Sequence, residues 1–195
     1  DTWHVQGAAI VALGRTRDER AVAFIERYLG VPSWQEHLTM RALAGLAHTR
    51  DAKVVDTLLA YSAAPYPSRI RAGAADALTT LGDRVESVRT AVVERLVEML
   101  SEPGFRCKYM AIHSLGRLKD VRALGALSVV HSQDPDGRFK RAAYEAIGAI
   151  RTGRTSEEGL AALRRQLEKL EGDNKALRTR VEALEGKVES LMAQD

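Results

Sequence analysis

The nine residues IRAGAADAL at positions 70–78 decide the fold, because related stretches recur along the chain. When the chain is aligned on itself, the last residue of each copy lies 33, 32, 37 and 32 residues after its predecessor. Every copy has alanine four residues before that position, and a regular period of this length is typical of repeat proteins. The closing residues are Leu13, Leu46, Leu78, Leu115 and Ile147, and the alanines are Ala9, Ala42, Ala74, Ala111 and Ala143.

Each copy is predicted to form one helix, which we call helix A. The residue eight positions before the closing residue is apolar, and the residue directly before it is small. Together with the alanine, these positions form one stripe on a helix of 3.6 residues per turn. Small side chains let a second helix approach closely, so the A helices are predicted to pack against one another. The apolar residues at the start of the stripe are Val5, Leu38, Ile70, Cys107 and Phe139.

A second helix, helix B, is predicted to follow each helix A. Four copies have aspartate five residues after the closing residue, and an aspartate there can cap the first N–H groups of a following helix. Prolines between each helix B and the next helix A mark the repeat boundaries. The long 37-residue spacing predicts a longer loop or a longer third helix B. The capping residues are Asp18, Asp51, Asp83 and Asp120, with Thr152 in the fifth copy, and the prolines are Pro32, Pro65, Pro67, Pro103 and Pro135.

The pattern at residues 5–14, 70–78 and 139–148 resembles HEAT repeats. In that family, antiparallel helix pairs stack into a right-handed solenoid. The resemblance implies an all-α, armadillo-like α-solenoid of about five repeats, which we place at residues 1–153. It implies no particular activity.

Residues 154–195 are predicted to form one long coiled-coil helix, a leucine zipper. Apolar residues recur there at the a and d positions of successive heptads, and such a seam needs a partner helix. Asn174 favours a parallel homodimer, because its amide then meets the same amide of the partner instead of being buried unpaired. The alternative, in which the helix folds back on the solenoid, stays open. The predicted dimerisation residues are Leu163, Leu167, Leu170, Asn174, Leu177, Val181, Leu184, Val188 and Leu191.

The sequence offers no recognisable catalytic, cofactor-binding or metal-binding motif. A single cysteine, Cys107, excludes an internal disulfide and a multi-cysteine metal site, and it is predicted to be an unreactive core thiol. Glu36 and His37 lack the second histidine of the H-E-x-x-H zinc motif. We therefore expect no cofactor and no enzymatic activity in this chain. If a metal were bound, the first residues to examine would be His4, His37 and His48.

Charge and hydropathy limit the partners to be expected. The chain has 29 basic and 26 acidic residues among 195, a net charge of +3. This mild excess is below that of typical nucleic-acid-binding proteins, so nucleic acid is not an expected partner. No apolar run is long enough for a membrane span, and no leader segment is recognisable, which predicts a soluble, cytoplasmic protein without a membrane partner. Trp3 and Trp34, near the starts of two A helices, are expected to pack between repeats, with a role in an interface as the alternative.

A second resemblance concerns context. Residues 32–37, 61–71 and 134–138 and the Leu-Glu-rich C-terminal helix are similar to the C-terminal region of bacterial alanyl-aminopeptidase-like zinc metallopeptidases. This similarity implies that the chain is the non-catalytic scaffold or dimerisation domain at the end of such an enzyme. None of that family's catalytic residues has a counterpart here.

Two other functions stay open. The first is a free-standing HEAT-repeat adaptor that binds a protein partner on the solenoid surface. The second, a HEAT-like enzyme such as the phycobilin lyases or DNA glycosylases, is disfavoured because no catalytic cluster is visible in the sequence.

Overall fold

The computed structural model describes residues 2–153, 167, 170, 174 and 175. The chain divides into two units, Asp1–Arg151 and Thr152–Asp195. Every regular element of the described residues is a helix. The α-helices are α1 (Thr2–Thr16), α2 (Glu19–Glu26), α3 (His37–Thr49), α4 (Val55–Tyr61), α5 (Ser68–Gly82), α6 (Glu86–Met99), α7 (Phe105–Leu118) and α8 (Leu124–Gln133), followed by a helix described over residues 137–153. Short 3₁₀ helices are η1 (Trp34–Glu36), η2 (Ala52–Val54) and η3 (Val121–Ala123).

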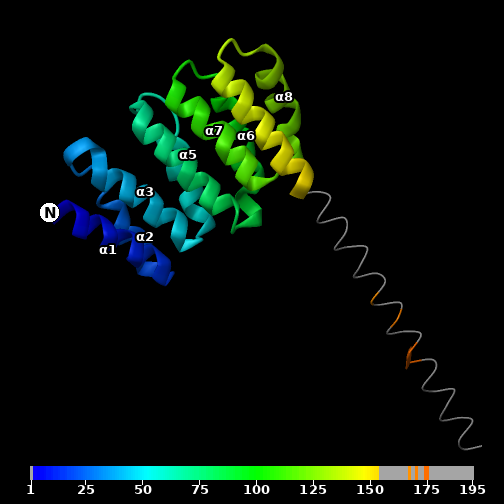
Figure 1. Cartoon of the computed structure of the whole chain (residues 1–195). Coiled ribbons are helices and arrows are strands. Elements are labelled where there is room, and N and C mark those ends of the chain that lie inside the picture. The colour runs from blue at the N-terminus through cyan, green and yellow to red at the C-terminus, as the bar shows by residue number, and fades with distance from the viewer. Residues whose placement is uncertain (1, 154–166, 168–169, 171–173, 176–195) are drawn as a thin grey trace, which may run out of the picture. The chain divides into compact units, whose positions relative to one another are not determined.

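The helices of the first unit form two layers, as the repeat pattern predicts. Figure 1 shows α1, α3, α5, α7 and the helix of residues 137–153 side by side in one layer, the A layer. Helices α2, α4, α6 and α8 are the B helices, each joining one A helix to the next. All five prolines lie outside the α-helices, between a B helix and the following A helix. The structure therefore confirms an all-α repeat array.

Aspartate caps set the start of three B-layer segments. The side chains of Asp18 and Asp51 accept hydrogen bonds of 2.9 Å from the backbone N–H groups of Arg20 and Lys53. Asp120 accepts the equivalent bond from the N–H of Arg122 at 3.0 Å. The three predicted caps are thus confirmed, since each satisfies an N–H group that a helix start leaves free.

The prediction for the third repeat was wrong at one residue. Asp83 is the C-terminal cap of α5, and α6 begins after Val85 without a side-chain cap. The extra residues of this repeat lengthen helix B instead, because α6 has 14 residues where α2, α4 and α8 have 8, 7 and 10. The additional turns move the start of the helix away from the aspartate.

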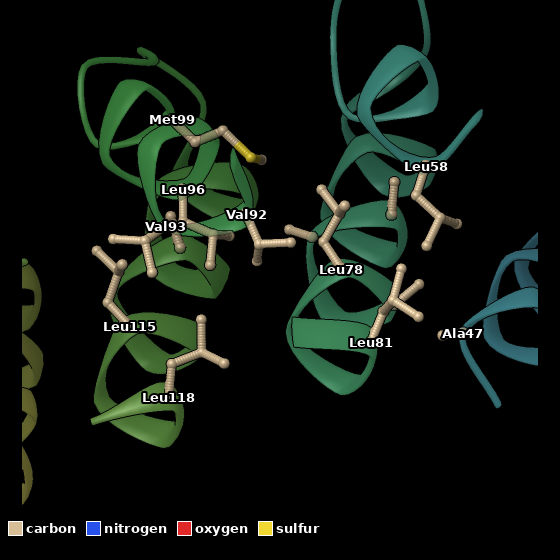
Figure 2. Packing of buried hydrophobic residues seen from close by; sticks show 14 of the residues in the cluster. Ala47, Leu58, Leu78, Leu81, Val92, Val93, Leu96, Met99, Leu115 and Leu118 are labelled. Carbon is tan, nitrogen blue, oxygen red and sulfur yellow. The ribbon is translucent and has the colours of Figure 1, made fainter. Parts of the chain in front are cut away.

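The core lies between the two layers and along the A helices. Ala42, Ala74, Ala111 and Ala143 are completely buried, as the helix A stripe predicts. Figure 2 shows the leucines of α5 and α7 beside the apolar side chains of α6 that cover them. In a core packed this closely, each side chain is buried by the side chains of the adjacent helices.

The first repeat departs from the predicted burial pattern. Val5 is 70% exposed, and Ala9 and Ala12 are exposed as well. Instead α1 buries Ile10 and Gly14, which face α3. In the later repeats the predicted stripe packs against the preceding A helix, and no described helix precedes α1. The helix A stripe therefore lies on the same face of α1 as in the other repeats, but no described helix covers that face.

The end of the first unit also differs from expectation. Thr152, expected to cap a fifth helix B, lies inside the helix that is described over residues 137–153. The predicted coiled coil at 154–195 falls outside the described residues except at four positions. None of the helices in the described part of the chain combines the length and the hydropathy that crossing a membrane requires.

Candidate binding surface

A groove runs over the outward face of α3, α5 and α7, and we call it the A-layer groove. Its volume is about 480 Å³. Gly73 lies at its floor, where a Cβ atom would come within 2.4 Å of the side chain of Met40. The lack of a side chain at Gly73 therefore lets the Met40 side chain contact the backbone of α5. The groove is lined by Met40, Ala44, Ala72, Gly73 and Met110 and by the polar His37, Arg41, Arg69, Asp76 and Arg106.

An exposed row of aromatic rings follows the outer side of α7, and we call it the aromatic row. Phe105, Tyr109 and His113 are spaced four residues apart, so they share one helix face. The ring centroids of Phe105 and Tyr109 are 5.4 Å apart, and those of Tyr109 and His113 are 4.5 Å apart. Phe105 remains 43% exposed and Tyr109 38% exposed. The four-residue spacing of these rings is present in the sequence, but no site was predicted from it.

A second hollow, of about 580 Å³, is lined by residues of the aromatic row and of the helix of residues 137–153. The guanidinium carbon of Arg138 lies 4.4 Å from the centroid of Phe105, a cation–π contact. Arg141 pairs with Glu145 on the other wall, with 3.0 Å between Nε and Oε1. Helix α7 lines both hollows, with Phe105 and Tyr109 in this one and the next residues along the chain, Arg106 and Met110, in the A-layer groove.

The groove carries unbalanced positive charge. Within the described residues, neither Arg41 nor Arg106 makes an ion pair, and Arg69 donates to the neutral Oε1 of Gln35 at 2.7 Å. Asp76, the acidic residue of the groove lining, is already paired with Arg117. An acidic ligand would therefore find guanidinium groups that are free to bind it.

Two of the histidines singled out in the sequence lie together. The ring centroids of His4 and His37 are 4.8 Å apart, and Nε2 of His37 is buried without a hydrogen-bond partner among the described residues. Burial lowers the pKa of His37, and the neighbouring His4 and Arg41 lower it further. The imidazole is therefore neutral at pH 7. Nowhere in the described residues do three His, Cys, Asp or Glu side chains converge as a metal ion requires.

Cys107 lies inside the array rather than at this surface. Its side chain is fully buried, and its Sγ lies 3.4 Å from the carbonyl oxygen of Ser68. Burial raises the pKa of the thiol, which keeps it protonated and weakly nucleophilic at neutral pH. The expectation of a core cysteine is confirmed.

Trp34 does not pack between repeats as expected. It lies in η1 and is 63% exposed, while Trp3 on α1 is 47% exposed. The 3₁₀ turn starts before α3 and holds the indole outside the layer of A helices.

Three of the predicted dimerisation residues are described. Leu167, Leu170 and Asn174 are helical and exposed in the single chain. The other six, Leu163, Leu177, Val181, Leu184, Val188 and Leu191, lie outside the described residues.

Comparison with known proteins supports the repeat architecture. Residues 5–30 match the PBS lyase HEAT-like repeat family. The matched segment comprises α1 and α2, which form the first helix pair of the array. No curated protein matches it significantly. Among solved structures, human deoxyhypusine hydroxylase in complex with glycerol is similar at 15% identity and a TM-score of 0.32, over 78% of this chain and 81% of that one.

One expectation from the sequence needs correction. The exclusion of enzymatic activity was wrong, because the lack of a recognisable motif does not show that a catalytic site is absent. The missing motif is a weak argument, because catalytic groups in a repeat array can come from different repeats that are far apart in the sequence. The family match is not to a peptidase, and it gives the similarity to aminopeptidases no support.

Proposed function

We propose that the chain is a HEAT-like scaffold that binds an acidic, partly apolar segment of a partner protein along its A layer. The observation that carries this proposal is that α7 lines both the A-layer groove and the hollow beside the aromatic row. Methionine, aromatic and arginine side chains are the types enriched in protein interfaces, and here all three types line adjoining hollows.

The chemistry of the surface specifies its partner. Met40 and Met110 give an adaptable apolar floor, since methionine side chains fill irregular gaps. Phe105 and Tyr109 offer rigid rings that a partner side chain can cover. Arg41 and Arg106 lack acidic partners within residues 2–153, so carboxylates of the partner segment would pair with them. A segment that alternates apolar and acidic side chains meets these requirements.

The test uses two synthetic amphipathic peptides with the same apolar residues, one with glutamates and one with lysines on the polar face. We expect the acidic peptide to bind and to shift the NMR signals of Met40, Tyr109 and Met110. Tyr109→Ala should weaken this binding about tenfold, the effect of a central interface anchor. Val129→Ala, which trims an exposed apolar residue of α8, is the matched control and should change nothing. Equal binding of both peptides, or signal shifts confined to the B helices, would refute the proposal.

A finer proposal concerns the context of this scaffold. The motifs at residues 32–37, 61–71 and 134–138 favour a place at the C-terminal end of a zinc aminopeptidase-like enzyme over a free-standing adaptor. Sequencing the reading frame upstream of residue 1 tests this directly. An H-E-x-x-H motif encoded there is expected, and a start codon at that point would favour the adaptor.

The zipper residues support a proposal about assembly. The heptad pattern from Leu163 to Leu191 favours a parallel homodimer, which would present two A-layer grooves per particle. Two linked binding sites raise the apparent affinity for a partner that carries two segments.

A further inference from the structure

A compact pocket lies at the opposite end of the A helices from the start of the aromatic row. It is formed where α1, α3 and α5 end, helices that Figure 1 shows side by side. Its volume is about 280 Å³. Four arginines and one histidine line it, so we call it the arginine pocket. Its polar residues are Arg15, Arg17, Arg50, Arg84, His48 and Thr80, and no acidic residue lines it.

The positive charge of the arginine pocket is not neutralised by the protein. Within the described residues, the side chains of Arg15, Arg17 and Arg50 make no ion pair and no hydrogen bond. Only Arg84 has a carboxylate partner, Asp83, and that pair is half exposed. Three guanidinium groups therefore keep all their donors available.

The aspartates that follow these arginines are engaged elsewhere. Asp18 accepts the backbone N–H of Arg20 and forms an ion pair with its side chain. Asp51 accepts the backbone N–H of Lys53 as the cap of η2. Their carboxylates stabilise the start of the next helical segment, so they do not turn back towards the pocket.

The helix dipole accounts for part of this arrangement. Arg17 and Arg50 each follow the end of an A helix, with φ of 58° and 60°. A basic residue at a helix C-terminus is stabilised by the partial negative charge there. Lys119 follows α7 in the same way, with φ of 54°, and does not line the pocket. The dipole also favours Arg15, in the last turn of α1, and Arg84, which follows the cap of α5. It thus explains a cation at each helix end, but it does not explain why cations from three helices converge on one hollow.

The pKa of His48 is affected by the same positive charges. Burial lowers its pKa, and Arg15, Arg50 and Arg84 lower it further, while Asp76 acts in the opposite direction. The imidazole is consequently neutral at pH 7 and can donate one N–H to a ligand.

We propose that the arginine pocket binds a phosphate group, either free or carried by a larger molecule. A phosphate has a charge of about −2 at neutral pH and three acceptor oxygens, which several guanidinium groups can share. A single carboxylate needs only one arginine for a two-point contact, so it would leave most of the pocket's charge unused. The C-terminal ends of helices carry partial negative charge, which repels an anion. Binding of phosphate must therefore depend on the arginine side chains.

The backbone offers variants that remove these side chains without harming the fold. Glycine tolerates positive φ better than arginine does, so Arg17→Gly and Arg50→Gly should fold at least as well as the parent chain. Lys119→Gly is the matched control, because it removes one positive charge from the same repeat position outside the pocket. Thermal melting of all three variants checks that each is folded.

Calorimetric titration of the full chain with inorganic pyrophosphate at low salt is the first test. We expect saturable binding that weakens about tenfold in Arg17→Gly and in Arg50→Gly, the loss typical of one charge-assisted hydrogen bond. Lys119→Gly should bind as the parent does. The NMR signals of the His48 ring should shift with the same saturation curve. Absence of saturable binding, or an equal loss in Lys119→Gly, would overturn the proposal and indicate only the overall charge of the surface.

A second set of titrations separates the two sources of phosphate. A phosphoserine peptide is compared with its unphosphorylated form and with pyrophosphate. Tighter binding of the phosphopeptide assigns the pocket to a modified protein, and tighter binding of pyrophosphate assigns it to a free anion. Equal binding of both forms of the peptide, with no binding of pyrophosphate, would refute phosphate recognition. Tyr109→Ala should leave all these affinities unchanged, so failure of the A-layer groove proposal is distinguishable from failure of this one.

Discussion

Gly14 and Gly45 bring α1 and α3 into backbone contact. A Cβ atom on Gly14 would lie 2.1 Å from the carbonyl oxygen of Gly45, and one on Gly45 would lie 3.0 Å from the carbonyl oxygen of Ile10. Because both residues lack a side chain, the backbones of α1 and α3 can come into contact. This contact fixes the first repeat to the array, because the opposite face of α1 is uncovered.

We predict that Gly14→Ala destabilises the chain by about 1–3 kcal/mol, since the helices must move apart to admit the methyl group. Alanine favours helix formation by about 1 kcal/mol relative to glycine, so the loss would occur despite a better propensity. Gly125→Ala, on the open surface of α8, is the control and should stabilise slightly. Urea unfolding measures both. A stabilised Gly14→Ala would contradict the contact.

The buried alanines of the A helices give a second prediction. Ala74→Leu and Ala111→Leu should each cost about 1–3 kcal/mol, because both positions are completely buried against neighbouring helices. Ala9→Leu changes the same repeat position on the exposed face of α1 and should be nearly neutral. Melting curves of the three variants test the pattern. Equal losses in all three would mean that the face of α1 is covered in solution.

The repeat architecture could be predicted because the deciding information is local and periodic. Ala42, Ala74 and Ala111 occupy equivalent positions on equivalent helices, so one helical pattern predicts their burial together. The same pattern could not predict Ala9, because burial also requires a neighbouring helix. The cap at Asp83 failed for a related reason, since the length of α6 depends on packing against α5 and α7 rather than on one residue.

The candidate sites were less predictable than the fold. The aromatic row lies on one helix, and its four-residue spacing was available in the sequence. The arginine pocket was not, because Arg15, Arg50 and Arg84 come from three repeats. Their convergence depends on how each helix A ends, and the positive φ of Arg50 is set by the turn into η2 rather than by a preference of arginine.

Asp120 gives a prediction about pH. Hydrogen bonds from the side chain and the backbone N–H of Arg122, with a further contribution from Arg89, lower the pKa of this nearly buried carboxyl from 3.8 to about 2. The folded state therefore binds its proton less readily than the unfolded state. The stability contributed by the carboxylate is fully present above about pH 4 and is lost as the pH falls towards 2.

Asp120→Asn tests this directly. At pH 7 it should destabilise the chain by about 1–3 kcal/mol, because it removes the charge that holds two arginines. The difference from the parent chain should shrink between pH 4 and pH 2. Asp51→Asn is the control, because Asp51 caps η2 in the same way and has no ion-pair partner within the described residues. Urea unfolding at several pH values measures both variants, and a difference that is constant across this range would contradict the assignment.

The last prediction concerns assembly, which the zipper pattern addresses. Five leucines at d positions and four apolar a positions form a seam that needs burial, and the described Leu167 and Leu170 are exposed in the single chain. Light scattering should therefore find a dimer at tens of micromolar. Deleting residues 160–195 should leave a folded monomer, because the helices of residues 2–153 contain a continuous apolar core of their own.

Asn174 tests the geometry of this dimer. In a parallel pair the two amides meet in one layer, and each satisfies the other. Asn174→Leu should therefore raise the stability of the dimer while allowing other orientations and strand numbers, because no polar layer then opposes them. Thermal melting of the coiled-coil helix measures the stability of the dimer, and light scattering measures the number of strands. A parent chain that stays monomeric would show that the C-terminal helix folds back, and an Asn174→Leu variant that melts earlier would contradict the parallel register.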